Sequence, residues 1–351
     1  ELELRQLALR ADRLQLEGRE QASRLFELPA LVRSSIRPLL RRRMSSAGQP
    51  ALDRDRRQRE ARHLRSLRRL AAVPWPCLWL AANFLCRSAW GRRLVLERFP
   101  LLGRQLEFSR RLFAALELPP DRAERELTQL YLNKFFQTVL IARLASLSPR
   151  QEARQFEVSG WEHLEAERAA GRPFIMGGSQ FGENRVFCLW LARRGVEVLS
   201  LAHGDQLQKL GVTKPPALRV IEIGAGFTPE IALTVMRHLR CGGCLQVTGD
   251  WPTQKDGPHS YERTFRGITR KYPQGMANFA LTGGAAILPY SCTLRPWGKV
   301  RIEIHPPLRP PSPAAPAGSA AREEQLAGLV DRFAGVLEAE IERSPGTQRW
   351  M

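Results

Sequence analysis

Acidic residues are scarce in this 351-residue sequence. It holds 35 aspartates and glutamates against 54 lysines and arginines, which leaves a formal net charge of +19 at pH 7. The excess lies toward the start, because residues 1–70 carry 18 arginines and only 9 acidic residues. A hydrophobic content of 43% excludes wholesale disorder. So basic a chain suits a polyanion, either a phosphate backbone or anionic lipid headgroups.

Cysteines are few and show no disulfide framework. The six that are present favour reduced thiols, and only Cys241 and Cys244 have the spacing of a metal or redox pair. A second pair of ligands is missing, so a glycine-ended helix that runs into a strand explains this segment better than zinc does. We therefore expect no bound metal.

The tryptophan-rich stretch at residues 70–90 lacks the length of a membrane-spanning helix. Its uncharged part, residues 70–86, is shorter than the roughly 20 residues needed and is interrupted by Pro74, Pro76 and Asn83. Flanking arginines favour a segment that lies in the membrane interface, with a spanning helix and an ordinary buried helix as alternatives.

Three regions follow from these patterns. We expect a basic helical region at residues 1–73, either solvated or binding headgroups, and an interfacial helical segment at 74–118. An α/β domain with a C-terminal helix is expected at 119–351. No signal peptide is recognisable, and the absence of a methionine before Glu1 indicates a fragment of a longer chain.

Apolar periodicity indicates an α/β domain with a largely parallel central sheet, because short apolar strands alternate with amphipathic helices. The predicted strands are 173–178, 196–201, 219–223, 244–248, 286–292 and 299–304. The predicted helices are 119–146, 183–194, 229–240, 275–282 and 320–343.

Residues 220–233 imitate a nucleotide or S-adenosylmethionine loop. A strand is followed by Gly224, Gly226 and a helix, as backbone approach to a cofactor requires. Thr228 and Pro229 stand where the third glycine of the fingerprint belongs, and Pro229 suits an ordinary first helical residue. A methyltransferase is therefore the least favoured of the alternatives.

Five stretches in chain order resemble the bacterial lipid A and lysophospholipid acyltransferase family. They are residues 117–140 (ELPPDRAERELTQLYLNKFFQTVL), 158–185 (VSGWEHLEAERAAGRPFIMGGSQFGENR), 232–251 (ALTVMRHLRCGGCLQVTGDW), 265–292 (FRGITRKYPQGMANFALTGGAAILPYSC) and 341–351 (IERSPGTQRWM). The resemblance implies an acyltransferase on the cytoplasmic face of the bacterial inner membrane. It implies transfer of a fatty acyl group from acyl carrier protein or coenzyme A to a lipid hydroxyl, without a bound cofactor.

The family places a His-X4-Asp/Glu pair directly after a strand, where this chain has GGSQFGENR. Alignment on Gly182 puts Gln180 at the position of the histidine and Arg185 at that of the acid. An amide is not basic at neutral pH and a guanidinium stays protonated, so neither supplies the expected base. Glu183 is the ionisable alternative in the same turn. Loss of positioned acid–base catalysis costs about 10²- to 10⁴-fold in rate.

Other residues are expected to contribute around this turn. We predict substrate contacts from Gly182, His203, Asp250, Arg266 and Gly267. His203 is also a substitute base if it points at the same rim. Ser179 lacks the Gly-X-Ser-X-Gly elbow of a serine hydrolase.

Two functional hypotheses result. The first is a membrane-associated lipid acyltransferase with an altered active turn, with anionic lipids and acyl carrier protein as partners and no nucleic acid. The second is a non-catalytic relative that keeps the groove for binding, because a guanidinium in a former catalytic turn suits a phosphate or carboxylate.

Overall fold

The computed structural model describes the backbone of residues 66, 69–98, 102–179, 184–202, 207, 212–223, 227–250, 260–312 and 314–347. Side chains are described in these ranges except at positions 98, 137, 138, 184 and 185. The chain divides into two units, Glu1–Ser66 and Leu67–Met351. The following description concerns the second unit, and nearly all of the basic region expected at 1–73 lies outside the described residues.

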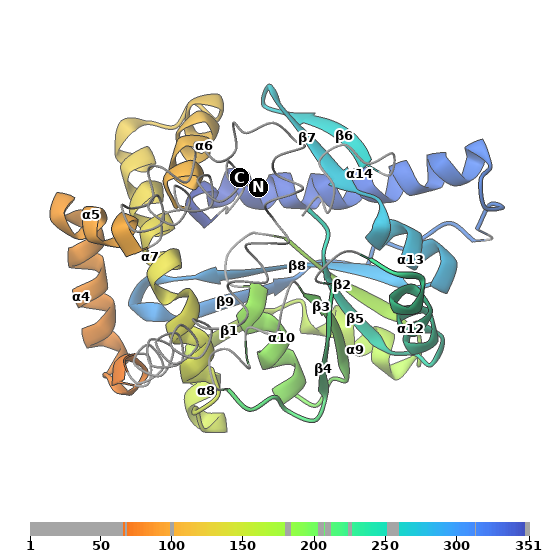
Figure 1. The fold of residues 1–351 in the computed structure, drawn as a ribbon, viewed down its shortest axis with the longest axis horizontal. Helices are drawn as coiled ribbons and strands as arrows, with labels where there is room; N and C mark the ends of the chain where they lie inside the picture. The colour runs from red at the N-terminus through yellow and green to blue at the C-terminus, as the bar shows by residue number, and fades with distance from the viewer. Residues whose placement is uncertain are drawn as a thin grey trace, which may run out of the picture. The chain divides into compact units, whose positions relative to one another are not determined.

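A seven-stranded sheet forms the centre of the described part of this unit, in the order β1-β9-β8-β2-β5-β3-β4 (Figure 1). Its strands are β1 (Phe156–Ser159), β2 (Phe174–Gly178), β3 (Val198–Ala202), β4 (Leu218–Glu222), β5 (Cys244–Thr248), β8 (Ala286–Leu294) and β9 (Val300–Ile304). The paired strands are parallel except β8 with β9. The predicted α/β fold with a mostly parallel sheet is confirmed.

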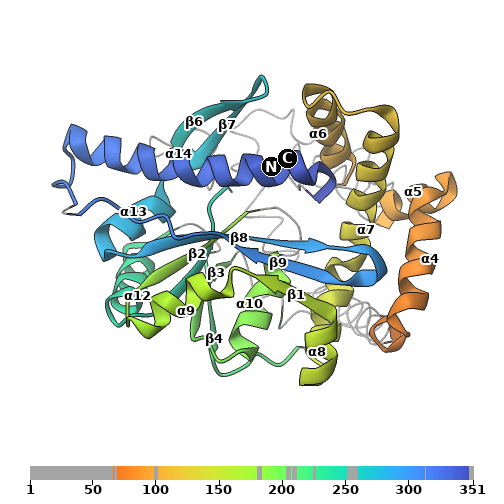
Figure 2. The same cartoon turned by 180° about the vertical axis from the view of Figure 1, so that it is seen from behind.

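Helices cover both faces of the sheet, as Figures 1 and 2 show from opposite sides. One face is covered by α7 (Pro120–Leu144), α9 (Trp161–Ala169) and α10 (Asn184–Arg193), and the other by α12 (Pro229–Arg240), α13 (Gly275–Gly283) and α14 (Ala320–Arg343). Because side chains alternate along a strand, Met176 of β2 joins the first core and its neighbour Ile175 joins the second. All five residues of β2 are buried, as expected for a central strand covered on both faces.

The five helices predicted in the α/β domain are confirmed as α7, α10, α12, α13 and α14. Pro229 is the first residue of α12, where its missing amide hydrogen costs no hydrogen bond, and the Thr228 side chain accepts from the Ile231 amide. The helix-start interpretation of Pro229 is therefore correct. The preceding glycines, Gly224 and Gly226, lie outside the described residues.

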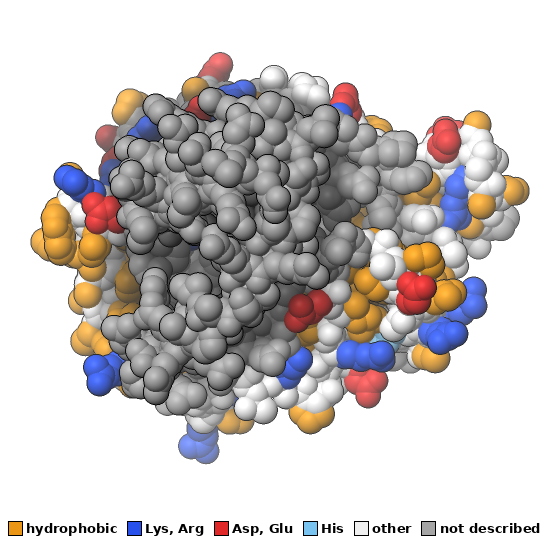
Figure 3. Space-filling view, in the orientation of Figure 1, with side chains coloured by type: hydrophobic (Ala, Val, Ile, Leu, Met, Phe, Trp, Pro, Cys, Tyr) orange, Lys and Arg blue, Asp and Glu red, His pale blue; other side chains and the backbone are white. Residues whose placement is uncertain are grey.

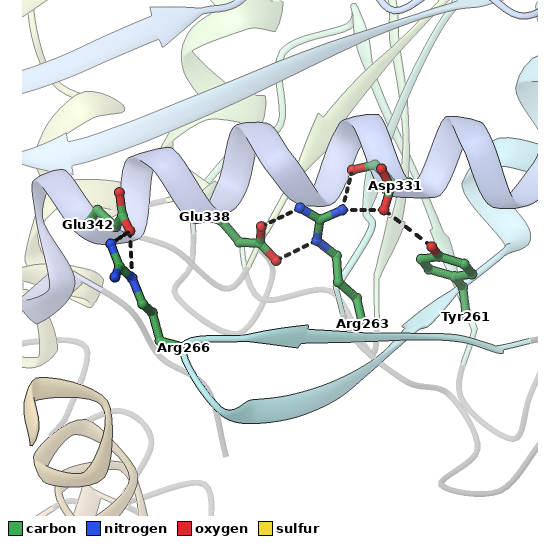
Figure 4. A network of polar contacts seen from close by, with 6 residues as sticks. All are labelled: Tyr261, Arg263, Arg266, Asp331, Glu338 and Glu342. Carbon is green, nitrogen blue, oxygen red and sulfur yellow. Dashed lines mark hydrogen bonds and ion pairs between the residues drawn. The ribbon is translucent and has the colours of Figure 1, made fainter. Parts of the chain in front are cut away.

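A hairpin of β6 (Ser260–Phe265) and β7 (Ile268–Pro273) was not predicted, and neither was β1. Arg266 and Gly267 form its two-residue tip with φ of 48° and 73°, the positive values that a tight hairpin turn requires. Three residues of the hairpin contact α14 (Figure 4). Arg263 pairs with Asp331 and makes two hydrogen bonds of 2.7 Å to Glu338, Tyr261 donates to Asp331, and Arg266 pairs with Glu342.

The tryptophan-rich segment forms α4 (Trp75–Arg87), which is followed by α5 (Ala89–Arg98) and α6 (Leu102–Ala115). The inner face of α4 is buried against α7, where the rings of Trp75 and Trp79 lie 5.0 and 5.6 Å from that of Phe136. Among the described residues, the helices are all too short or too polar to cross a bilayer. The buried-helix alternative thus describes only one face of α4, because Leu80 and Phe84 on the same helix are exposed.

Short elements complete this unit. Helix α8 (Pro149–Gln155) begins with a capping box formed by Ser148 and Gln151, and the turns η2 (Pro296–Gly298) and η3 (Pro345–Thr347) follow β8 and α14. The turn η3 packs on α7, because the Gly346 amide donates to the Glu126 carboxylate at 2.8 Å. The last described residues are thereby attached to the first helix of the α/β domain.

Candidate functional site

The ends of β2 and β5 lie side by side at the carboxyl edge of the sheet. Gly178 pairs with Thr248 in the parallel register, and the Gly249 amide donates to the Gly178 carbonyl at 2.8 Å. Ser179 and Asp250 come next in the two chains, and each is only 2% exposed. Ligands of open α/β sheets bind outside the carboxyl ends of the strands, so this edge is the candidate site.

Glycines at this edge are required by close packing on both faces. A Cβ on Gly178 would lie 2.5 Å from the Tyr290 hydroxyl, on the face that α10 covers. On the opposite face, a Cβ on Gly249 would lie 2.7 Å from both Met276 of α13 and Phe333 of α14. Gly177 is equally restricted, with Phe333 at 2.9 Å. The first two glycines of GGSQFGENR, Gly177 and Gly178, are therefore explained by packing that is independent of any ligand.

A chain of buried polar groups crosses the sheet at the level of Gly178. The Ser200 hydroxyl on β3 donates to the Gln246 side-chain carbonyl on β5 at 2.7 Å, and the Gln246 amide donates to the Tyr290 hydroxyl on β8 at 3.0 Å. Tyr290 reaches across β2 because Gly178 has no side chain, and its ring stacks on Phe187 of α10 at 3.7 Å. Burial raises the pKa of Tyr290 well above its usual value, so its hydroxyl stays protonated at neutral pH.

A second group missed by the sequence analysis comes from β7. Burial lowers the pKa of the Arg270 guanidinium to about 10, and the negative charge of Asp250 opposes that fall. The guanidinium carbon lies 5.3 Å from the ring centroid of Tyr272, whose pKa burial raises to about 12. At neutral pH Arg270 is therefore positive, and it interacts electrostatically with Asp250. The polar residues in otherwise apolar strands, such as Gln246 in CLQVT, were the available signal for these groups.

The predicted site residues are distributed as follows. Gln180, Gly182, Glu183 and His203 lie outside the described residues, and Arg185 is in the first turn of α10 with only its backbone described. Asp250 is at the edge of the sheet, next to the end of β2. Arg266 and Gly267 are at the tip of the hairpin, where Arg266 already has a carboxylate partner in Glu342.

One cluster among the described residues has the composition of a metal site. Donor atoms of Glu303, His305 and Glu340 lie within 4.8 Å of one another, between β9 and α14. Arg343 pairs with Glu303 at 2.8 Å and with Glu340 at 2.7 Å, and Arg301 also pairs with Glu303. Because guanidinium groups already neutralise both carboxylates, this arrangement is an ion-pair cluster and not a cation site.

The Cys241 and Cys244 segment matches its structural explanation. Helix α12 ends at Arg240, Gly242 has a φ of 76°, and Cys244 begins β5 as a buried residue. Burial raises the pKa of the Cys244 thiol above its ordinary value, which disfavours the thiolate that metal binding needs.

Comparison with known proteins points to one enzyme class. No protein-family model matches the chain. The chain is 26% identical over 205 residues to the phosphatidylinositol mannoside acyltransferase of Mycobacterium tuberculosis strain CDC 1551 / Oshkosh. It is 25% identical over 203 residues to the enzyme of the same name from strain ATCC 25618 / H37Rv. The chain is similar to acyltransferases. Each match covers 55% of this chain and about 60% of the relative's length. This distant similarity supports an acyltransferase family.

In this acyltransferase-like chain, the described part of the edge supplies a buried carboxylate, a buried guanidinium and a tyrosine hydroxyl beneath the turn. The histidines whose side chains are described are His163, His238 and His305, and none of them comes from the segments that follow β2 or β5. His238, for example, contacts the Cys244 carbonyl at the opposite end of β5, 3.0 Å away. The described edge is therefore suited to holding a polar or anionic group, with Asp250 as the buried carboxylate that follows β5.

Proposed function

We propose that this chain is a membrane-associated lipid acyltransferase-like protein. It transfers a fatty acyl group from a thioester, on acyl carrier protein or coenzyme A, to a lipid hydroxyl at the carboxyl edge of β2 and β5. The hydrogen bond from Gly249 to Gly178 carries this proposal, because it brings buried Asp250 against the turn that matches the family's catalytic turn. The similarity to phosphatidylinositol mannoside acyltransferases supports the same reaction class.

The reaction requires removal of the acceptor's proton as its oxygen attacks the thioester carbonyl. Asp250 is the base that the described edge offers. The positively charged Arg270 and this carboxylate attract each other. A carboxylate is a weak base at neutral pH. We therefore expect slow transfer that depends on Asp250, at the cytoplasmic face of the bacterial inner membrane.

The test is an acyl-transfer assay with purified protein and a labelled fatty acyl group. Donors are acyl carrier protein and coenzyme A thioesters, and acceptors are phosphatidylinositol mannoside and a lipid A precursor. Asp250→Asn should lower kcat at least about 100-fold if the carboxylate accepts the proton. Glu165→Gln, which removes an exposed carboxylate of α9, is the matched control. Equal rates for the wild type and Asp250→Asn would refute this role of Asp250.

A non-catalytic binding protein is the second candidate. Gln180 and Arg185 at the positions of the family's base and acid favour it, as does the cationic Arg270 at the same edge. The Gln180→His, Arg185→Glu double variant distinguishes the two. Transfer gained only in the double variant supports a binding protein, whereas wild-type transfer that is lost in Asp250→Asn refutes it.

A further inference from the structure

Helices α4 and α5 carry an apolar surface that faces away from the core. Of the large hydrophobic side chains exposed in the described part of the chain, half come from 15 consecutive residues: Leu80 (54% exposed), Phe84 (75%), Trp90 (68%) and Leu94 (48%). We call these four residues the α4–α5 surface. Figure 3 shows hydrophobic side chains gathered over these two helices, with basic side chains beside them.

The opposite face of α4 is packed against α7, so the exposed side chains belong to a helix that is held firmly in place. Trp75 and Trp79 pack on Phe136, and the Arg143 guanidinium lies 4.6 Å from the ring centroid of Trp75. Arg143 also donates to the carbonyls of Ala71 and Val73, at 2.8 and 3.1 Å. A helix that is apolar on all sides but packed against the core along one side only has a second side that suits another apolar environment, such as a protein partner or a membrane.

The junction of α4 and α5 fixes the two halves of the surface relative to each other. The Ser88 hydroxyl donates to the Leu85 carbonyl and accepts from the Gly91 amide, both at 3.0 Å. A Cβ on Gly91 would lie 2.1 Å from the Leu85 carbonyl oxygen, so only glycine permits this close approach. The Arg92 side chain donates to the Cys86 carbonyl at 2.6 Å. These contacts fix α5 relative to α4, so the α4–α5 surface is preformed.

The charge of this segment indicates what the α4–α5 surface binds. Residues 69–98 contain five arginines and one glutamate, and Arg93, next to the surface, has 82% of its side chain exposed. Contact between two copies of this surface would bring like charges together, whereas an anionic bilayer neutralises them. Tryptophan and phenylalanine beside arginine suit the depth of lipid headgroups. We propose that the α4–α5 surface binds anionic bilayers, with Phe84 and Trp90 inserted between headgroups.

This inference goes beyond acyl transfer and is tested without any acyl donor. The full chain is mixed with vesicles of phosphatidylcholine alone or with phosphatidylglycerol, and bound protein is separated by flotation. Measurement is made at low salt and at about 0.5 M NaCl, where screening suppresses the general attraction of the basic chain. Phe84→Ser with Trp90→Ser should lower the partition coefficient for anionic vesicles at least about tenfold at high salt.

Two matched controls accompany this variant. Phe227→Ser with Leu233→Ser removes two other exposed apolar side chains and should bind as the wild type does. Arg87→Glu with Arg93→Glu should weaken binding at low salt far more than Arg219→Glu with Arg240→Glu, which makes the same change of charge at exposed residues of β4 and α12. The charge variants keep the proposal testable even if the double serine variant fails to fold.

Four results would overturn the proposal. These are absence of wild-type binding, equal binding to both vesicle types, wild-type binding by the Phe84 and Trp90 double variant, and loss of a lipid-free dimer in that variant. The last would make the surface an interface between copies of this chain. An inactive protein that still binds vesicles through this surface would refute the proposed function and leave this inference intact.

Discussion

At the scale of single residues, the packing at the end of β2 depends on glycines, which leave room for side chains from other elements. Gly178 leaves the space through which Tyr290 reaches Gln246, and Gly177 and Gly249 leave the space that Phe333 and Met276 fill. None of these partners belongs to the segment GGSQFGENR. The predicted end of this strand at residue 178 is confirmed, but from the sequence alone its glycines had only a motif-based explanation and not a packing one.

Gly178→Ala should destabilise the protein by about 2 kcal/mol, because the new methyl group must displace the Tyr290 hydroxyl from a buried hydrogen bond. Urea denaturation followed by circular dichroism measures the effect. Gly275→Ala at the start of α13 is the control, because its Cβ would have no neighbour within 4 Å. If both variants unfold at the same urea concentration, the packing argument for Gly178 is wrong.

At the scale of elements, ion pairs attach the β6–β7 hairpin to α14. Glu338 is only 7% exposed and receives two hydrogen bonds from Arg263. These hydrogen bonds and the pair with Asp331 raise the pKa of Arg263 above its ordinary value. The outer pair of Arg266 and Glu342 is largely solvated, with 55% and 43% of the side chains exposed. The inner contact therefore carries most of the attachment.

Arg263→Met should cost on the order of 2 kcal/mol in the free energy of unfolding, because it leaves the Glu338 carboxylate buried without its partner. Arg266→Met should change that free energy by less than about 0.5 kcal/mol. Hydrogen exchange of the β6 and β7 amides measures the attachment directly. Faster exchange in Arg266→Met than in Arg263→Met would contradict this ranking.

The contact between β9 and α14 should make stability depend on acid pH. Burial alone would raise the pKa of Glu340, but its contact with His305, the positive charge of Arg343 and its contact with Ser291 outweigh burial and lower that pKa from its ordinary value. A carboxylate whose pKa is lowered by folding stabilises the protein above its unfolded pKa, and the contribution is lost as pH falls through the folded value. Glu303 also faces this group.

Glu340→Gln should therefore flatten the loss of stability between about pH 5 and pH 3 relative to the wild type. The free energy of unfolding in urea, measured at several pH values, gives the slope. Glu342→Gln is the control and should keep the wild-type slope. An unchanged slope in Glu340→Gln would show that this carboxylate does not contribute to acid unfolding.

At the scale of the whole molecule, strongly apolar elements were predictable and polar ones were not. The six predicted strands and five predicted helices are present because buried central strands and amphipathic helices leave clear periodic patterns. The β6–β7 hairpin was missed because its strands are half-exposed and carry charged residues such as Arg263 and Lys271. Likewise, the neighbourhood of Asp250 and Arg270 depends on contacts between distant segments that no local pattern records.

The last described turn should contribute to the stability of the whole α/β domain. A Cβ on Gly346 would lie 2.1 Å from the Glu126 carbonyl oxygen of α7, so Gly346→Ala must move backbone. We expect a lower melting temperature by several degrees, with α7 and the sheet lost in one transition. Calorimetry, with Gly328→Ala on α14 as the control, measures this. A separate early transition would show that η3 detaches without affecting the domain.

The packing around Gly177, Gly178 and Gly249 also bears on how the chain could have diverged. Phe333, Met276 and Tyr290 contact the end of the central strand from three other elements, and none of these three residues lies in the segment GGSQFGENR. Substitutions that leave these contacts unchanged therefore need not disturb the fold around the end of β2. In such a fold, the residues that maintain packing differ from those that carry out a reaction. A reaction can therefore change or be lost during evolution while selection for stability preserves the fold.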